Sequence, residues 1–221
     1  MKKIYLLFMC FFAGAVFLSG CSNEEPFEKK SYTPDVQIHE INLDVRDRAI
    51  EVSLSKDEQI HIRYLESTKE SYDIAILDGT ILKMTSISNK NWTDYLGRKT
   101  ASENRKIWLQ IPDTMLDNLT LSTTNEDISL PALAVTGNIS LSTNGGNLSF
   151  EKLTTGSALT LSVKNGDISG AIAGSYEDYS IESNIKKGES NLPSQKADGT
   201  KKLNVSCNHG DVAIEFVNNG Q

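Results

Sequence analysis

Residues 139–168 read ISLSTNGGNLSFEKLTTGSALTLSVKNGDI, and one pattern occurs twice within them. Each copy has an alternating apolar segment, a turn containing Asn and Gly, and a second apolar run. Alternation with period two is typical of β-strands. The pattern extends to both sides at a spacing of 20 residues, with 24 before the last copy. It aligns four columns: Leu119, Ile139, Leu159, Tyr179 and Leu203; Leu121, Leu141, Leu161, Ile181 and Val205; Thr123, Thr143, Val163, Ser183 and Cys207; and, opening the second strand, Ile128, Leu148, Ile168 and Val212.

A repeat of about 20 residues with two short strands and two turns is typical of a β-solenoid, in which each coil climbs one strand spacing, about 4.8 Å. The sequence therefore predicts an all-β, single-stack solenoid with coils of about 20 residues. A sandwich of hairpins is the alternative, because Asn165-Gly166 between alternating runs is also a hairpin signal. The solenoid is favoured, since a sandwich gives no reason for constant spacing. The fourth copy has residues 184–188 inserted and is expected to be the weakest coil.

The first half of the chain carries the same strand signal without a fixed period. Short alternating segments recur about every ten residues, which is typical of an all-β protein. No segment of about ten residues or more has helical periodicity. The predicted strands of this half lie within residues 36–43, 50–54, 60–64, 72–76, 81–84 and 107–111.

The first 20 residues have the pattern of a bacterial lipoprotein signal peptide. Lys2 and Lys3 precede an uncharged run at 4–18, which is too short to span a bilayer easily. Leu18-Ser19-Gly20-Cys21 then resembles a lipobox, in which the cysteine receives lipid and becomes the new N-terminus. We expect Cys21 to attach the protein to the extracytoplasmic face of a cell membrane, because several acyl chains anchor a protein stably. An uncleaved membrane anchor is the alternative.

Cleavage before Cys21 would leave 201 residues with 20 basic and 29 acidic side chains, a formal charge of −9, because Lys2 and Lys3 leave with the signal peptide. That charge argues against nucleic acid as a partner. Residues 21–35, with two prolines and mixed charges, are predicted to be the lipidated cysteine and a linker. The 14 residues after Cys21 would reach at most about 46–50 Å. The folded domain is expected at 36–217, followed by a tail at 218–221.

Three features together resemble a known bacterial family. They are the segment KIWLQIP at 106–112, the repeated LxLSxxNGDI units, and the closing segment KLNVSCNHGDVAIEF at 202–216. This combination is similar to the candidate-adhesin family DUF4097 over about residues 36–217. The resemblance implies a right-handed β-solenoid on an envelope protein, without catalytic residues or a cofactor.

Signatures of chemistry are scarce in the sequence. It has no HExxH, CxxC, GxSxG or phosphate-binding glycine-rich motif, so we predict no catalytic residues and no metal site. The column Asp127, Asn147, Asp167 and Asp211 leaves three readings open: turn stabilisation, calcium binding, or a catalytic carboxylate pair. Cys207 is interpreted as a small filler of its column. The three histidines are isolated, and His209 occupies a turn position.

The segment 86–105 interrupts the strand pattern with about twenty residues, and loops of that length are usually functional or disordered. It is locally basic and holds two aromatic residues. Aromatic and guanidinium groups together suit sugars or anionic polymers. Trp92, Tyr95, Arg98 and Lys99 are therefore the candidate ligand-binding residues. The alternatives are that the aromatic residues pack back on the solenoid or that the segment is disordered.

These observations favour a lipid-anchored, non-catalytic adhesion or interaction module at the cell envelope, with an envelope polymer or surface ligand as partner. A second hypothesis is an accessory of envelope-stress sensing that binds a membrane protein. A third is a small carbohydrate-active enzyme, although β-helical enzymes usually have longer coils and clustered acid and base residues.

Overall fold

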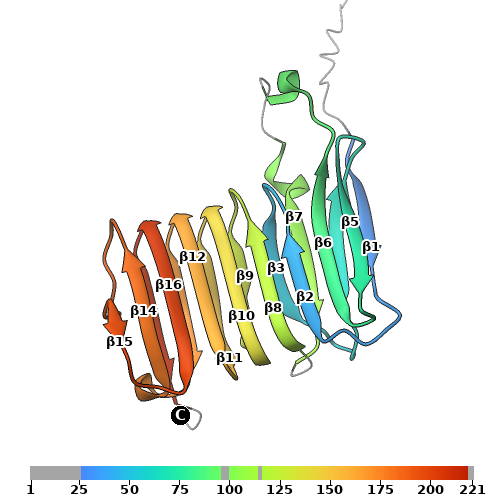
Figure 1. The fold of residues 1–221 in the computed structure, drawn as a ribbon. Helices are drawn as coiled ribbons and strands as arrows, with labels where there is room; N and C mark the ends of the chain where they lie inside the picture. The colour runs from blue at the N-terminus through green and yellow to red at the C-terminus, as the bar shows by residue number, and fades with distance from the viewer. Residues whose placement is uncertain (1–25, 96–99, 114–115, 219–221) are drawn as a thin grey trace, which may run out of the picture.

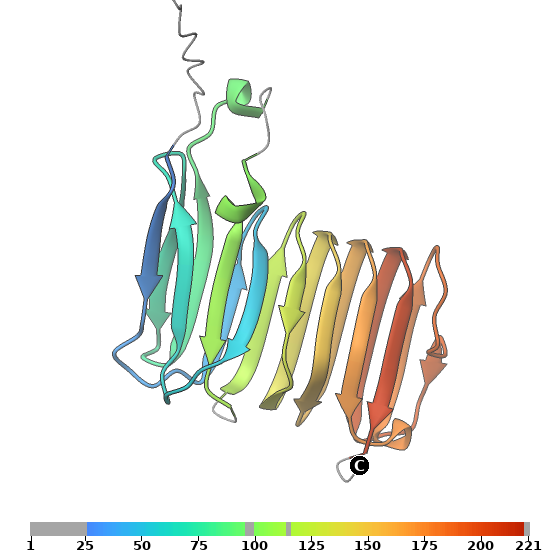
Figure 2. The ribbon, with the colours of Figure 1, turned by 180° about the vertical axis from the view of Figure 1, so that it is seen from behind.

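The computed structural model describes residues 26–95, 100–113 and 116–218. The strands form one strongly curled sheet with two broad faces, drawn in Figures 1 and 2. The strands are β1 (Glu28–Tyr32), β2 (Glu40–Asp44), β3 (Ala49–Leu54), β4 (His61–Glu66), β5 (Glu70–Leu77), β6 (Ile81–Ser88), β7 (Lys106–Ile111), β8 (Leu116–Thr123), β9 (Ile128–Leu130), β10 (Leu133–Gly145), β11 (Leu148–Thr155), β12 (Ala158–Asn165), β13 (Ile168–Ala173), β14 (Tyr179–Ile185), β15 (Gln195–Lys196), β16 (Lys201–His209) and β17 (Val212–Val217). Short 3-10 helices are η1 (Trp92–Tyr95), η2 (Ser102–Asn104) and η3 (Tyr176–Asp178).

Parallel pairing between coils confirms the predicted all-β solenoid. On the first face β6, β2, β8, β10, β12, β16 and β14 pair in this spatial order, all in parallel. On the second face the parallel order is β7, β3, β9, β11, β13 and β17. The hairpin sandwich is wrong, because Asn165-Gly166 joins the two faces of one coil, and β12 and β13 pair with other coils.

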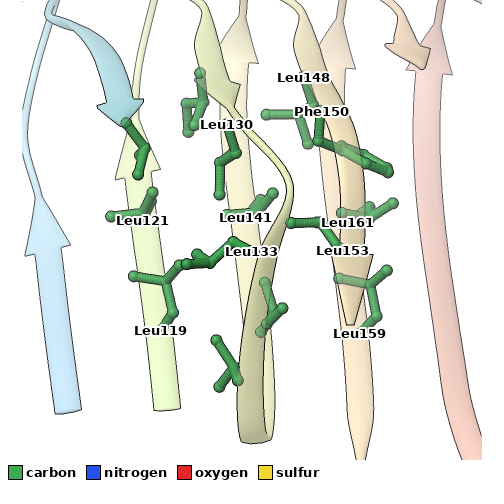
Figure 3. Packing of buried hydrophobic residues seen from close by; sticks show 14 of the residues in the cluster. Leu119, Leu121, Leu130, Leu133, Leu141, Leu148, Phe150, Leu153, Leu159 and Leu161 are labelled. Atoms are coloured by element: carbon green, nitrogen blue, oxygen red, sulfur yellow. The ribbon is translucent and has the colours of Figure 1, made fainter. Parts of the chain in front are cut away.

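Apolar columns fill the space between the two faces, as Figure 3 shows for the central coils. Leu121 pairs with Leu141, and Leu141 with Leu161, and all three are fully buried. The second strands begin where the sequence predicts, at Ile128, Leu148, Ile168 and Val212. Removing one such leucine side chain typically costs about 2–5 kcal/mol, because neighbouring coils close the cavity only partly.

The last two coils do not stack in sequence order. Strand β16 lies between β12 and β14, so the chain passes over one position, forms the terminal coil and then returns to fill the gap (Figure 1). The predicted columns are therefore wrong for the fourth copy: Ile181 pairs with Leu203, and Ser183 with Val205. Tyr179 pairs with Lys201, outside the column. The physical reason is that, in the described part of the chain, β14 is the last parallel strand of the first face, with only the two-residue β15 beyond it, so its register is set by β16 and not by β12.

The N-terminal end has the same inserted arrangement. Strand β2 lies between β6 and β8, and β3 lies between β7 and β9, although both precede these neighbours in sequence by many residues. Beyond this stack the direction reverses, because β5 pairs antiparallel with β6, and β4 pairs antiparallel with β7. The six strands predicted in this half correspond to β2–β7.

The segment predicted to be a linker is only partly so. Strand β1 lies within it and pairs antiparallel with β4 from Glu28↔Glu66 to Tyr32↔Ile62. Apolar alternation is weak in EKKSY because β1 is the edge strand of the second face and is largely exposed. The folded chain therefore begins at Glu28, not Val36. Residues 1–20, Cys21, Arg98 and Lys99 lie outside the described residues, as do 219–221 of the expected tail.

Candidate functional site

The acidic column forms a ladder of hydrogen bonds between coils. Asp127 Oδ1 accepts the N–H of Asn147 at 2.7 Å, and Asn147 Oδ1 accepts that of Asp167 at 2.9 Å. Asp167 Oδ1 accepts the N–H of Asp211 at 2.8 Å, and Asp211 Oδ1 accepts that of Glu189 at 2.8 Å. Each side chain thus holds the turn of the next coil rather than its own. This geometry supports the turn-stabilising role among the three readings of the sequence.

Cys207 has the environment of a packing residue. It is fully buried and aligned with Val163 on one side and Ile185 on the other. Its Sγ donates to the carbonyl oxygens of Gly210 and Gly166, at 3.4 and 3.5 Å. Burial, with a smaller contribution from Asp167, raises the pKa of the thiol. These contacts favour an unreactive side chain.

The histidines are separate from one another in the fold. His61 lies 2.9 Å from Asp57 Oδ1 and contacts Thr33, whereas His39 lies 3.6 Å from Asp117. Hydrogen bonds from Ser55 and then from His61 lower the pKa of Asp57 to about 2. Within the described residues, no three His, Cys, Asp or Glu side chains are grouped in a way that could hold a metal ion.

The base of the long loop is fixed by a buried ionic cluster that no sequence pattern indicates. Arg48, 2% exposed, lies 3.3 Å from Glu70 and donates through Nε to the Tyr72 hydroxyl at 2.6 Å. Lys90 reaches the same Glu70 carboxylate at 2.7 Å. At the other end of the loop Arg105 pairs with Glu126. Two of the basic loop residues therefore anchor the loop to the solenoid.

The tip of the loop projects beyond the ends of the strands, as Figure 2 shows. Helix η1 is held there by Asp94, which accepts from Lys69 at 2.6 Å and from the N–H of Asn91 at 2.8 Å. The two contacts lower the pKa of the Asp94 carboxyl, the hydrogen bond from Lys69 contributing most. Trp92 is 74% exposed, so the reading in which it packs back on the solenoid is wrong. Tyr95 lies in η1, and the other two candidate residues are outside the described residues.

A flat polar surface on the first face was missed by the sequence analysis, although the alternation contains it. The outward-facing residues of four central strands align across coils in two rows. None of these side chains makes a hydrogen bond within the part of the chain that the structure describes. We call this surface the hydroxyl face. It comprises Thr120, Ser140, Thr160 and Asn204 in one row and Ser122, Ser142, Ser162 and Ser206 in the other.

One open cavity of about 380 Å³ lies near the N-terminal end of the stack. Its lining includes Asp35, Glu58 and Pro112 and contains no Lys, Arg, His, Ser, Thr or Cys residue. None of the helical turns in the described part of the chain is long and apolar enough to cross a bilayer.

The family model of the Toastrack DUF4097 domain matches residues 38–220. This chain belongs to the Toastrack DUF4097 family. Among solved structures, a candidate cell adhesion protein from Clostridium sporogenes is similar to it, with a TM-score of 0.58 and 10% identity over 88% of this chain and 100% of that chain. A candidate adhesin from Parabacteroides merdae gives a TM-score of 0.40 at 17% identity, over 87% of this chain and 82% of that chain. No curated protein matches. At these identities the Clostridium sporogenes structure supports the Toastrack fold alone.

Proposed function

We propose that this Toastrack protein is a lipid-anchored, non-catalytic interaction module of the cell envelope. In this proposal the hydroxyl face binds a repeating, hydroxyl-rich polymer such as an envelope polysaccharide. The observation that carries the proposal is the free, regular array of hydroxyl and amide groups on that face. The candidate cell adhesion protein of similar fold is consistent with an interaction module.

The geometry of the face suits a ligand with many similar groups. Adjacent strands of a sheet lie about 4.8 Å apart, so each row offers a polar side chain at that interval. Ser and Thr hydroxyls can both donate and accept, which matches the hydroxyl groups of a sugar. The eight residues carry no charge, so binding of an uncharged polymer does not require any of them to lose the hydration of an ion. Many weak contacts along one rigid surface add to a useful affinity.

The lipid anchor in this proposal rests on Leu18-Ser19-Gly20-Cys21 and the uncharged run before it. The non-catalytic role is supported by the acidic column, whose side chains are occupied by backbone N–H groups. If the lipid on Cys21 keeps the protein at the extracytoplasmic face of the membrane, the hydroxyl face lies outside the cytoplasm.

The test is cosedimentation of the full-length lipoprotein, held in detergent, with insoluble envelope polysaccharide. The variant Ser140→Ala/Thr160→Val/Ser162→Ala removes three hydroxyl groups but keeps strand-forming side chains of similar shape. The matched control Ser149→Ala/Ser169→Ala removes exposed hydroxyls from the second face, where the two residues are paired across β11 and β13. At about 0.5–1.5 kcal/mol for each lost hydrogen bond, we expect binding to weaken at least about tenfold in the first variant only.

Equal binding by both variants would contradict the role of the hydroxyl face. A Trp92→Ala/Arg98→Ala variant tests the long loop in the same assay, and loss of polymer binding in that variant alone would return the site to the loop. Retention by membrane proteins, with no binding to polysaccharide, would instead favour an accessory that binds a membrane partner.

A further inference from the structure

The tip of the long loop exposes a tryptophan that has no hydrogen-bond or ring partner among the described residues. Trp92 is more exposed than any other exposed large apolar side chain in the described residues. Indole rings are favoured at membrane–water interfaces, because one part of the ring is apolar and its N–H donates a hydrogen bond. Exposure alone does not identify a ligand, but the position of Trp92 in the fold does.

The loop tip lies next to the point where the chain enters the fold. Glu28, the first residue of β1, pairs with Glu66 at the end of β4. Three residues later Lys69 forms its ion pair with Asp94 of η1, and its carbonyl accepts the N–H of Asn89 at 2.8 Å. The start of β1 and η1 are therefore at the same end of the strands, as Figure 1 shows.

The distance from the expected lipid to this point is short. Glu28 lies seven positions after Cys21, which allows at most about 23–25 Å between them. That is about half the reach of the linker predicted from sequence. A membrane that holds Cys21 is therefore kept within a short distance of the loop tip.

The loop presents Trp92 from a fixed base. Lys90 is paired with Glu70 beside buried Arg48, and Asp94 is paired with Lys69. Lys90 and Asp94, the described charged residues on either side of Trp92, are both paired, so the contact proposed for Trp92 rests on burial of the indole rather than on these two charges.

We propose that the η1 tip is a membrane-contacting element, in which Trp92 inserts into the interface of the bilayer that carries the Cys21 lipid. This inference rests on the lipid anchor of the proposed function. Because η1 projects beyond the ends of the strands, such a contact leaves both broad faces in solvent, including the hydroxyl face. The element would fix the orientation of the solenoid as well as its location.

The experiment uses the processed lipoprotein reconstituted into phosphatidylethanolamine and phosphatidylglycerol vesicles with brominated acyl chains, which quench tryptophan on contact. The chain has two tryptophans, so Trp108→Phe leaves Trp92 as the reporter and Trp92→Phe leaves Trp108. A third protein, Trp92→Phe/Trp108→Phe/Tyr176→Trp, places the reporter at the exposed position 176, which contacts Phe216 of β17 at the other end of the stack. Vesicle binding is measured separately by cosedimentation.

We expect quenching to be several-fold stronger for Trp92 than for the other two reporters, with a blue shift of its emission and little change at high salt. Bound protein with equal quenching of all three reporters would overturn the contact and leave the anchor intact. Quenching of Trp92 that disappears at high salt would overturn insertion of the indole. Failure of the lipoprotein without substitutions to cosediment with the vesicles would overturn the lipid anchor and this inference together.

Discussion

The backbone N–H of Asp211 donates to Asp167 Oδ1 at 2.8 Å, although 44 residues separate the two in sequence. The bond joins β12–β13 to β16–β17, so the coil containing Asp211 occupies the place that the intervening coil would take in a sequential stack. Asp211 then accepts from Glu189, which belongs to the terminal coil. The hydrogen bonds of the acidic column therefore follow the spatial order of the coils and not their order in the sequence.

Asp167→Ala should destabilise the protein by about 1 kcal/mol, because the N–H of Asp211 loses its acceptor. Asp167→Asn keeps an acceptor oxygen, as Asn147 does in the neighbouring coil, and should be close to neutral. Urea unfolding followed by circular dichroism measures both. Equal destabilisation by the two substitutions would show that charge, not the hydrogen bond between coils, is what matters at this position.

Gly166→Ala should destabilise more than Gly79→Ala. Both glycines have positive φ, at +141° and +75°, so each substitution strains the backbone. A Cβ at Gly166 would also lie 2.2 Å from the carbonyl oxygen of Gly146 in the adjacent coil, whereas a Cβ at Gly79 meets nothing within 4 Å. Thermal unfolding of the two variants separates the stacking clash from the strain. A similar loss in both would mean that the coils can separate locally at little cost.

Glu70→Ala should release the long loop and lower stability by about 3–5 kcal/mol, because it leaves the buried Arg48 guanidinium without its carboxylate partner. Lys90→Gln, which removes the more exposed partner of the same carboxylate, should cost less. Limited proteolysis at the lysines and arginines of 86–105 measures directly how accessible the loop is to protease. Protection of the loop in Glu70→Ala equal to that of the unsubstituted protein would contradict the anchoring role.

Alkaline pH should destabilise the native protein through Tyr179. Burial raises the pKa of Tyr179 from 10.0 to about 12, and its hydroxyl donates to the Ala173 carbonyl at 2.9 Å. The folded state holds the proton more tightly than the unfolded state, so stability is full below about pH 10 and falls as the pH rises from 10 to 12. The loss is at most about 3 kcal/mol. The free energy of unfolding, measured by urea unfolding between pH 10 and 12, should fall less steeply with pH in Tyr179→Phe. An unchanged slope would mean that other groups cause the loss of stability.

The sequence predicted the repeating unit well because each column depends on local alternation. Leu121, Leu141 and Leu161 form the predicted column, and β13 begins at Ile168 as expected. It could not predict the order of the coils, since the apolar alternation of a parallel strand such as β16 suits pairing with β12 and with β14 alike. Consecutive stacking was an assumption, and it misaligned Tyr179.

The site was harder to predict than the fold. The hydroxyl face was present in the alternation as Thr120 and Ser122, but outward polar residues are ordinary in strands and carried no distinct signal. Arg48 has no pattern in sequence that marks it as buried, because its partners Glu70 and Tyr72 come from another strand. Trp92 was identified as a candidate, whereas its place beside the start of β1 depends on the pairing of β1 with β4.

The most direct test of the proposed binding surface is protection from a thiol reagent. Ser142→Cys places a thiol on the hydroxyl face, and Ser149→Cys places one on the second face, while the native Cys207 is buried and should remain unlabelled. Labelling is measured with the full-length lipoprotein, free and bound to envelope polysaccharide. The account predicts that bound polymer slows labelling of Ser142→Cys several-fold and leaves Ser149→Cys unchanged. Equal labelling of both sites in the bound state, or protection of Ser149→Cys alone, would contradict it.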